Sequence, residues 1–141
     1  MHKAQALLLS CIDFRFQKMM GDFMEVDEHA LKSFDRVALA GGVKQLIHPD
    51  NKAIKDFILG QINISIKLHD PEAIYLMNHE DCGAYGANNS FAVHQEDLLA
   101  TVKLLSQIYP QKKFRLLIAT FNGIREISTE DNQTNMQFLL N

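Results

Sequence analysis

Cysteine is scarce in this chain, and charge of neither sign is concentrated in it. The 141 residues include 2 cysteines, and 14 Lys and Arg stand against 17 Asp and Glu, which gives a net charge of −3. Neither sign forms a long block, so the basic footprint expected of a nucleic-acid-binding protein is missing. A small neutral or anionic ligand is compatible with this balance.

Long hydrophobic runs are also missing. The N-terminal stretch has one Lys and an apolar core of about six residues before polar groups return, too short for a signal peptide or a membrane span. We therefore expect a soluble, cytoplasmic protein with no membrane partner. In that reducing compartment, the two cysteines are expected to be thiols or metal ligands rather than a disulfide.

Neither sequence repeats nor low-complexity segments divide the chain. A hydrophobic content of 47% over 141 residues is enough for one sizeable core and too little for two. The sequence therefore predicts a single domain over residues 1–141.

Apolar runs that end in polar or glycine residues alternate with segments of helical spacing. The runs, which are typical of strands buried on both faces, are Ala4–Asp13, Phe34–Gly42, Glu72–Glu80 and Lys113–Phe121. The helical segments are an amphipathic stripe over residues 16–24, a helix of about 20 residues from Pro49-Asp50 to Asp70-Pro71, and one closed by Pro110. The pattern predicts an α/β fold of three layers, with a parallel four-stranded sheet and crossover helices. Within the remaining tail, IREIST is a candidate short edge strand.

Candidate metal ligands follow two of these predicted strands. Cys11 comes at the end of the first, and His79 and Cys82 come at the end of the third. In open parallel sheets, ligands bind beyond the carboxyl ends of the strands. Two thiolates and one imidazole suit Zn²⁺, and three protein ligands leave a fourth position for water or a carboxylate, as in catalytic sites. We therefore predict that Cys11, His79 and Cys82 bind zinc.

Asp13 and Arg15 flank Cys11 and are the candidate catalytic residues. As an ion pair, Arg15 would keep Asp13 charged and oriented, and Asp13 would then accept a hydrogen bond from zinc-bound hydroxide. Zinc lowers the pKa of bound water to about 7, which makes that hydroxide available at neutral pH. Freed from Arg15, Asp13 would instead ligate zinc and close the site. The alternative is an ion pair of little consequence at the surface.

The stretch C-I-D-F-R, followed much later by H-E-D-C-G, resembles the paired Cys-x-Asp-x-Arg and His-x-x-Cys motifs of the β-class carbonic anhydrases. The resemblance extends over about residues 4–121. It implies zinc ligation by Cys11, His79 and Cys82, with Asp13 and Arg15 as the catalytic dyad. It also implies reversible hydration of carbon dioxide to bicarbonate, a four-stranded parallel sheet and a homodimer as the smallest unit.

The chain departs from the family pattern at two places. Phe14 stands where members commonly have Ser, and Ala38-Leu39 stand where they have Arg-Asn. A more apolar pocket leaves open a hydrolase of another small carbonyl or thiocarbonyl compound. A non-catalytic zinc-binding protein, with Asp13 permanently in the fourth position, is a third hypothesis. The chain also begins almost at its first strand, so we expect no N-terminal helical arm of the kind that many members wrap around a partner.

Simpler interpretations exist for several of these residues. Cys11 and Cys82 could be buried thiols that act as small hydrophobes. A thiol phosphatase is excluded, because the Cys-x5-Arg pattern is absent. Gly41-Gly42 is expected to be a turn, since neither G-x-G-x-x-G nor a Walker pattern accompanies it. His48 or His94 would be proton shuttles if either reached the site.

Overall fold

A five-stranded sheet with the order β2-β1-β3-β4-β5 forms the centre of the molecule. The structure is a computed structural model, and it describes residues 2–27 and 33–128. Parallel pairing joins β1 (Ala6–Ser10) to β2 (Phe34–Ala38) and to β3 (Ala73–His79). Strand β3 also pairs in parallel with β4 (Lys113–Thr120). The predicted α/β fold with its four parallel strands is therefore confirmed.

The fifth strand, β5 (Gly123–Ile127), pairs antiparallel with β4 and extends the predicted sheet. Only Phe121 and Asn122 connect the two strands, and a connection this short permits antiparallel but not parallel pairing. The Thr120 hydroxyl closes the turn by donating to the Gly123 carbonyl at 2.7 Å. The candidate edge strand IREIST is thus confirmed for its first part, and the tail from residue 129 lies outside the described residues.

The first long helix lies within its predicted bounds, and the second ends before Pro110 as the sequence predicts. In α3 (Lys52–His69), the Asn51 side chain caps the first turn by accepting from the Ile54 amide at 2.9 Å. In α4 (Phe91–Ile108), Ser90 caps the helix in the same way. Their predicted proline boundaries are also confirmed. The short α2 (Lys44–Ile47) was not predicted, because four residues are too few to show a helical period.

The amphipathic stripe after the first strand forms a composite helical segment. A 3₁₀ turn (Phe14–Phe16) leads into α1 (Gln17–Asp22), which continues as a π-helical segment (Phe23–Asp27). Met20 and Met24 are fully buried, so these two residues of the stripe belong to the core. Among the described residues, none of the helices is both long enough and apolar enough to cross a membrane.

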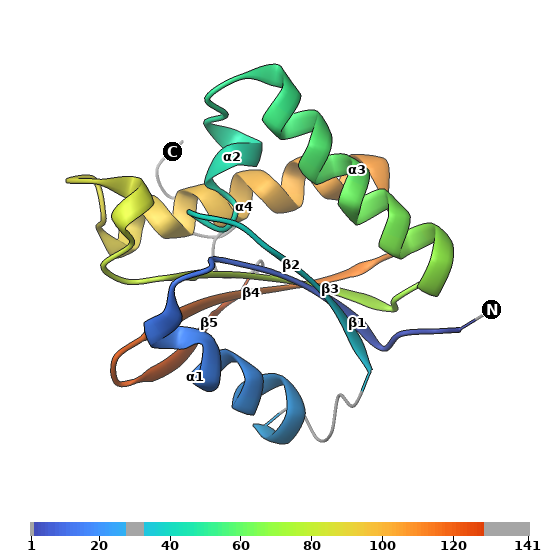
Figure 1. Cartoon of the computed structure of the whole chain (residues 1–141), viewed down its shortest axis with the longest axis horizontal. Coiled ribbons are helices and arrows are strands. Elements are labelled where there is room, and N and C mark those ends of the chain that lie inside the picture. The colour runs from blue at the N-terminus through green and yellow to red at the C-terminus, as the bar shows by residue number, and fades with distance from the viewer. Residues whose placement is uncertain (1, 28–32, 129–141) are drawn as a thin grey trace, which may run out of the picture.

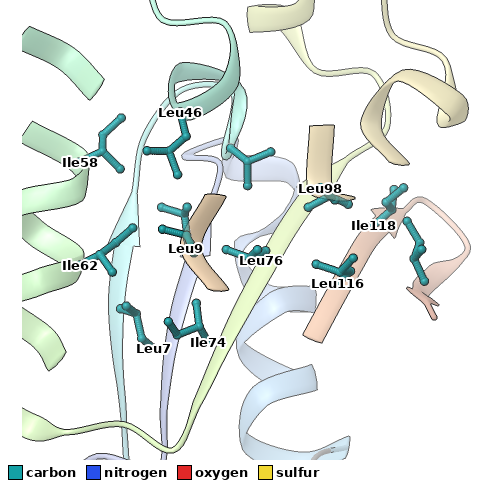
Figure 2. Close-up of a cluster of buried hydrophobic side chains, with 13 residues drawn as sticks. Leu7, Leu9, Leu46, Ile58, Ile62, Ile74, Leu76, Leu98, Leu116 and Ile118 are labelled. Atoms are coloured by element: carbon teal, nitrogen blue, oxygen red, sulfur yellow. The ribbon is translucent and has the colours of Figure 1, made fainter. Parts of the chain in front are cut away.

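The helices cover both faces of the sheet, which gives the predicted three layers (Figure 1). Successive strand residues point to opposite faces, so Leu7 and Leu9 of β1 contact one layer and Ala6 and Leu8 the other. The core shown in Figure 2 lies between the sheet and α2, α3 and α4. Its labelled side chains are Leu7, Leu9, Leu46, Ile58, Ile62, Ile74, Leu76, Leu98, Leu116 and Ile118. The second core lies between the sheet and the α1 segment.

Candidate metal centre

The parallel strands bring the predicted zinc ligands to one edge of the sheet. Cys11 directly follows β1, His79 is the last residue of β3, and Cys82 lies on the loop after it. One ligand atom from each lies within 4.8 Å of the others, and all three residues are buried. The structure therefore assembles a Cys-His-Cys group that could hold a metal ion, while ligation itself stays a prediction.

The two cysteine sulfurs lie 4.0 Å apart, about twice the length of a disulfide bond, and both thiols are free. The hydrogen bond with Cys82 lowers the pKa of Cys11, and the same contact, with burial, raises the pKa of Cys82. The Gly41 amide also donates to the Cys11 sulfur at 3.4 Å. These contacts favour a thiolate at Cys11, which is the form of cysteine that binds metals.

One nitrogen of the His79 imidazole makes a hydrogen bond and the other makes none. Its Nδ1–H donates to the Glu80 carbonyl at 2.7 Å, so Nε2 carries the lone pair. Within residues 2–27 and 33–128, this Nε2 is buried and has no hydrogen-bond partner. Phe16 stacks on the ring with centroids 4.6 Å apart and so restricts its rotation. An orphaned acceptor costs about 1–3 kcal/mol, and a metal ion bound between Nε2 and the two sulfurs would remove that cost.

Asp13 and Arg15 form the ion pair expected from their spacing. The guanidinium donates to both carboxylate oxygens, from Nε to Oδ1 at 3.0 Å and from Nη2 to Oδ2 at 2.7 Å. These hydrogen bonds lower the pKa of Asp13 to about 2. Asp13 Oδ2 lies 3.7 Å from His79 Nε2, so the carboxylate adjoins the Cys-His-Cys group. At neutral pH it is ionised and can only accept hydrogen bonds.

Asp81 connects this ion pair to the loop that carries Cys82. Its carboxylate accepts from Arg15 Nη1 at 2.9 Å, and its carbonyl accepts from Arg15 Nη2 at 2.8 Å. Asp81 has a φ of 54°, in the left-handed region that aspartate tolerates better than most residues. Arg15 thus bridges the turn after β1 and the loop after β3. In the sequence, only its position directly before Cys82 distinguishes Asp81.

Gln17 and Arg36 support the site and were missed by the sequence analysis. The Gln17 amide donates to the carbonyls of Cys11 at 3.0 Å and Asp13 at 2.8 Å, which holds the turn between them. Arg36 donates to the Gln17 side chain and, at 3.2 Å, to the Ser10 hydroxyl. In the sequence, Gln17 is an ordinary polar residue of an amphipathic helix and Arg36 an ordinary polar residue of an edge strand. No spacing rule therefore identifies either as part of the site.

Arg36 lies on the strand where the family's Arg-Asn pair is replaced by Ala38-Leu39. Positions 36 and 38 of β2 are two apart, so their side chains share one face of the sheet. The Arg36 guanidinium reaches Ser10, at the end of β1, from this face. The two candidate proton shuttles, His48 and His94, are not members of the Cys-His-Cys group.

Three exposed apolar side chains lie on the segments that carry the group and its ion pair. Phe14, in the turn after Cys11, is 86% exposed, and Ile12 and Phe121 are 57% and 55% exposed. The Arg15 guanidinium lies 5.4 Å from the centroid of the Phe121 ring, which places this ring beside the ion pair. The position where the family commonly has Ser is thus occupied by an unburied aromatic ring.

Residues 1–127 match a family model described as "Putative carbonic anhydrase". The chain belongs to this family. An uncharacterized protein of Rickettsia bellii is 26% identical over 140 residues, covering 89% of this chain and 82% of the relative. A second relative, from Rickettsia conorii, is also 26% identical, over 89% of this chain and 73% of its own length.

Solved β-carbonic anhydrases share the fold of this family member. The b-carbonic anhydrase CafA of Aspergillus fumigatus has a TM-score of 0.59 at 13% identity, over 95% of this chain and 81% of that protein. The Coccomyxa β-carbonic anhydrase in complex with acetazolamide has a TM-score of 0.55 at 12% identity, over 94% and 78%. The predicted resemblance to the β-class is therefore confirmed at the level of the fold.

Proposed function

We propose that this protein catalyses the reversible hydration of carbon dioxide to bicarbonate and that Cys11, His79 and Cys82 hold the zinc ion for this reaction. The observation that carries the proposal is the buried, unpartnered His79 Nε2 beside two cysteine sulfurs 4.0 Å apart. Two soft sulfur ligands and one imidazole suit zinc better than magnesium or calcium, which prefer oxygen. A fourth position remains for the reaction.

Zinc, when bound by three protein ligands, acidifies a water molecule and so supplies a nucleophile at neutral pH. Asp13 would orient that nucleophile, because its ionised carboxylate only accepts and therefore selects a group that still carries a proton. Arg15 holds the carboxylate by two hydrogen bonds, which fixes its direction and its charge. This pairing disfavours the hypothesis that Asp13 fills the fourth position, since the carboxylate would first have to leave the guanidinium.

Stopped-flow measurement of carbon dioxide hydration tests the proposal directly. The zinc-loaded protein is compared with Cys82→Ser, which removes one sulfur ligand, and the zinc content of both is measured on the same samples. We expect hydration by the parent well above the variant. Hydration no faster than that of the variant, in a parent that contains zinc, would overturn the proposed reaction but not the metal site.

A second candidate is hydrolysis of a small thiocarbonyl compound at the same site. The exposed apolar side chains of Ile12, Phe14 and Phe121 favour it, because carbon disulfide and carbonyl sulfide are uncharged and weakly hydrated and so bind readily beside apolar groups. Turnover of carbon disulfide or carbonyl sulfide without carbon dioxide hydration would favour this candidate. Homodimer formation and a cytoplasmic location stay predictions from the sequence.

A further inference from the structure

A chain of buried hydrogen bonds lies beneath the Cys-His-Cys group and includes Asn78, the residue before His79 on β3. Its Oδ1 accepts from the Val43 amide at 3.1 Å, and its Nδ2 donates to the Tyr85 hydroxyl at 2.9 Å and to His94 Nδ1 at 3.0 Å. The Val43 N–H fixes the orientation of the Asn78 side-chain amide. If that amide were flipped, its NH₂ group would face the Val43 N–H, and two donors would meet without an acceptor.

The first branch of this chain runs through Tyr85 to Asp97 of α4. The Tyr85 hydroxyl donates to Asp97 Oδ2 at 2.8 Å, and His48 Nε2 lies 2.9 Å from Asp97 Oδ1. Asp97 is only 4% exposed, so its carboxylate depends on these partners. Because the hydroxyl hydrogen points to Asp97, the Tyr85 oxygen is left to accept from Asn78.

The second branch runs from Asn78 through His94 to the loop of Cys82. Since His94 Nδ1 accepts from Asn78, its Nε2 carries the hydrogen and donates to Asn89 Oδ1 at 3.2 Å. Asn89 encloses Cys82: its Oδ1 accepts from the Cys82 amide at 2.8 Å and its Nδ2 donates to the Cys82 carbonyl at 2.7 Å.

Both branches end on groups that contact the candidate metal site. Asn78 holds the turn after β2, in which the Gly41 amide donates to the Cys11 sulfur. Asn89 holds the backbone of Cys82 itself. Tyr85 also contacts the site directly, since its amide donates to the Cys82 carbonyl at 3.0 Å and its ring packs against Cys11 and Cys82. The Tyr85 hydroxyl and Asp97 are linked to the three candidate ligands through Asn78 and Asn89 in these hydrogen bonds, so removing the hydroxyl alone tests that link.

We propose that Tyr85 and Asp97 are positioning residues for the metal site: by directing the Asn78 amide, they fix the Gly41 turn against the Cys11 sulfur and the Asn89 clamp on Cys82. This inference rests on the proposed function, because it concerns how tightly and with what geometry the Cys-His-Cys group holds its metal. It assigns α4 a part in the site that no motif in the sequence indicates.

Metal release and metal spectra test this inference in the full chain. The variants are Tyr85→Phe, which keeps the ring and removes the hydroxyl, Asp97→Ala, and Asp97→Asn, which keeps an oxygen that accepts from Tyr85. Ile62→Val, a truncation in the core between sheet and α3, serves as a control for general destabilisation. Each protein is loaded with zinc, and the rate at which its zinc passes to a chromophoric chelator is measured. Each protein is also loaded with Co²⁺, and its visible spectrum is recorded.

We expect Tyr85→Phe and Asp97→Ala to release zinc at least about tenfold faster than the parent, which is the usual effect of losing a partner of the ligand shell. Their Co²⁺ bands should shift, Asp97→Asn should lie closer to the parent than Asp97→Ala, and Ile62→Val should keep the parent's spectrum. Parent-like release and spectra in Tyr85→Phe and Asp97→Ala would overturn the inference while leaving the proposed function intact. A parent that binds no zinc would instead overturn the proposed function.

Discussion

Gly42→Ala is the substitution whose effect follows most directly from the geometry of the site. Gly42 has a φ of +60°, and a Cβ at this position would lie 2.4 Å from Asn78 Oδ1 and 3.3 Å from the Met77 carbonyl oxygen. The Asn78 oxygen cannot withdraw freely, because the amide is bonded to Val43, Tyr85 and His94.

The expected cost has two parts. A left-handed backbone costs a residue with a Cβ about 1–2 kcal/mol. Displacing the buried Asn78 amide leaves donors or acceptors unpaired, at about 1–3 kcal/mol. We therefore expect the free energy of unfolding to fall by about 2–5 kcal/mol, which is a large part of the total for a domain of this size.

Equilibrium denaturation in urea, at one fixed zinc concentration, measures this change. Gly60→Ala is the matched control: Gly60 lies inside α3 with nothing within 4 Å of its added Cβ, so it should gain up to about 1 kcal/mol from helix propensity. A Gly42→Ala protein within about 0.5 kcal/mol of the parent would refute the reasoning about the Asn78 amide.

Three further predictions concern the ion pair and the surface beside it. Arg15→Gln should slow carbon dioxide hydration about 10- to 100-fold at unchanged zinc content, because Asp13 loses its orientation; an unchanged stopped-flow rate would exclude the dyad. The same variant should raise the Asp13 pKa from about 2 toward the ordinary 3.8 in an NMR titration. Since the pKa of Asp13 is lowered in the folded protein, the ion pair stabilises the fold above about pH 4, and this contribution is lost as the pH falls toward 2. A titration midpoint of 3.8 or above for Asp13 in the parent would contradict this prediction. Phe14→Ser should change unfolding by less than about 0.5 kcal/mol, because the ring is 86% exposed, yet raise carbon dioxide hydration relative to carbon disulfide turnover; an unchanged ratio would show that Phe14 does not set specificity.

The sequence predicted those parts of the fold that local chemistry determines. Strands buried on both faces appear as apolar runs. Helix α3 lies between Asn51 and Asp70, because the Asn51 side chain caps its start and Pro71 follows its end. The convergence of Cys11 with His79 and Cys82 was predictable too. It requires only that parallel strands end at one edge of the sheet and that the ligands come directly after them.

The supporting residues could not be predicted, because their partners are set by tertiary packing. In the sequence, Asp97 is one of several polar residues of an amphipathic helix. Its hydrogen bond with Tyr85 depends on how α4 packs on the sheet. Arg36 likewise reaches Ser10 and Gln17 across a strand pair whose register the sequence does not specify. Each contact joins segments that are separated in the chain and share no motif.

Metal analysis of the purified protein by mass spectrometry tests the central claim most directly. If Cys11, His79 and Cys82 form one zinc site, the protein should contain about one equivalent of zinc per chain, and Cys82→Ser should lose most of it. No bound metal, iron in place of zinc, or a zinc content that is the same with and without the Cys82 sulfur would contradict the claim.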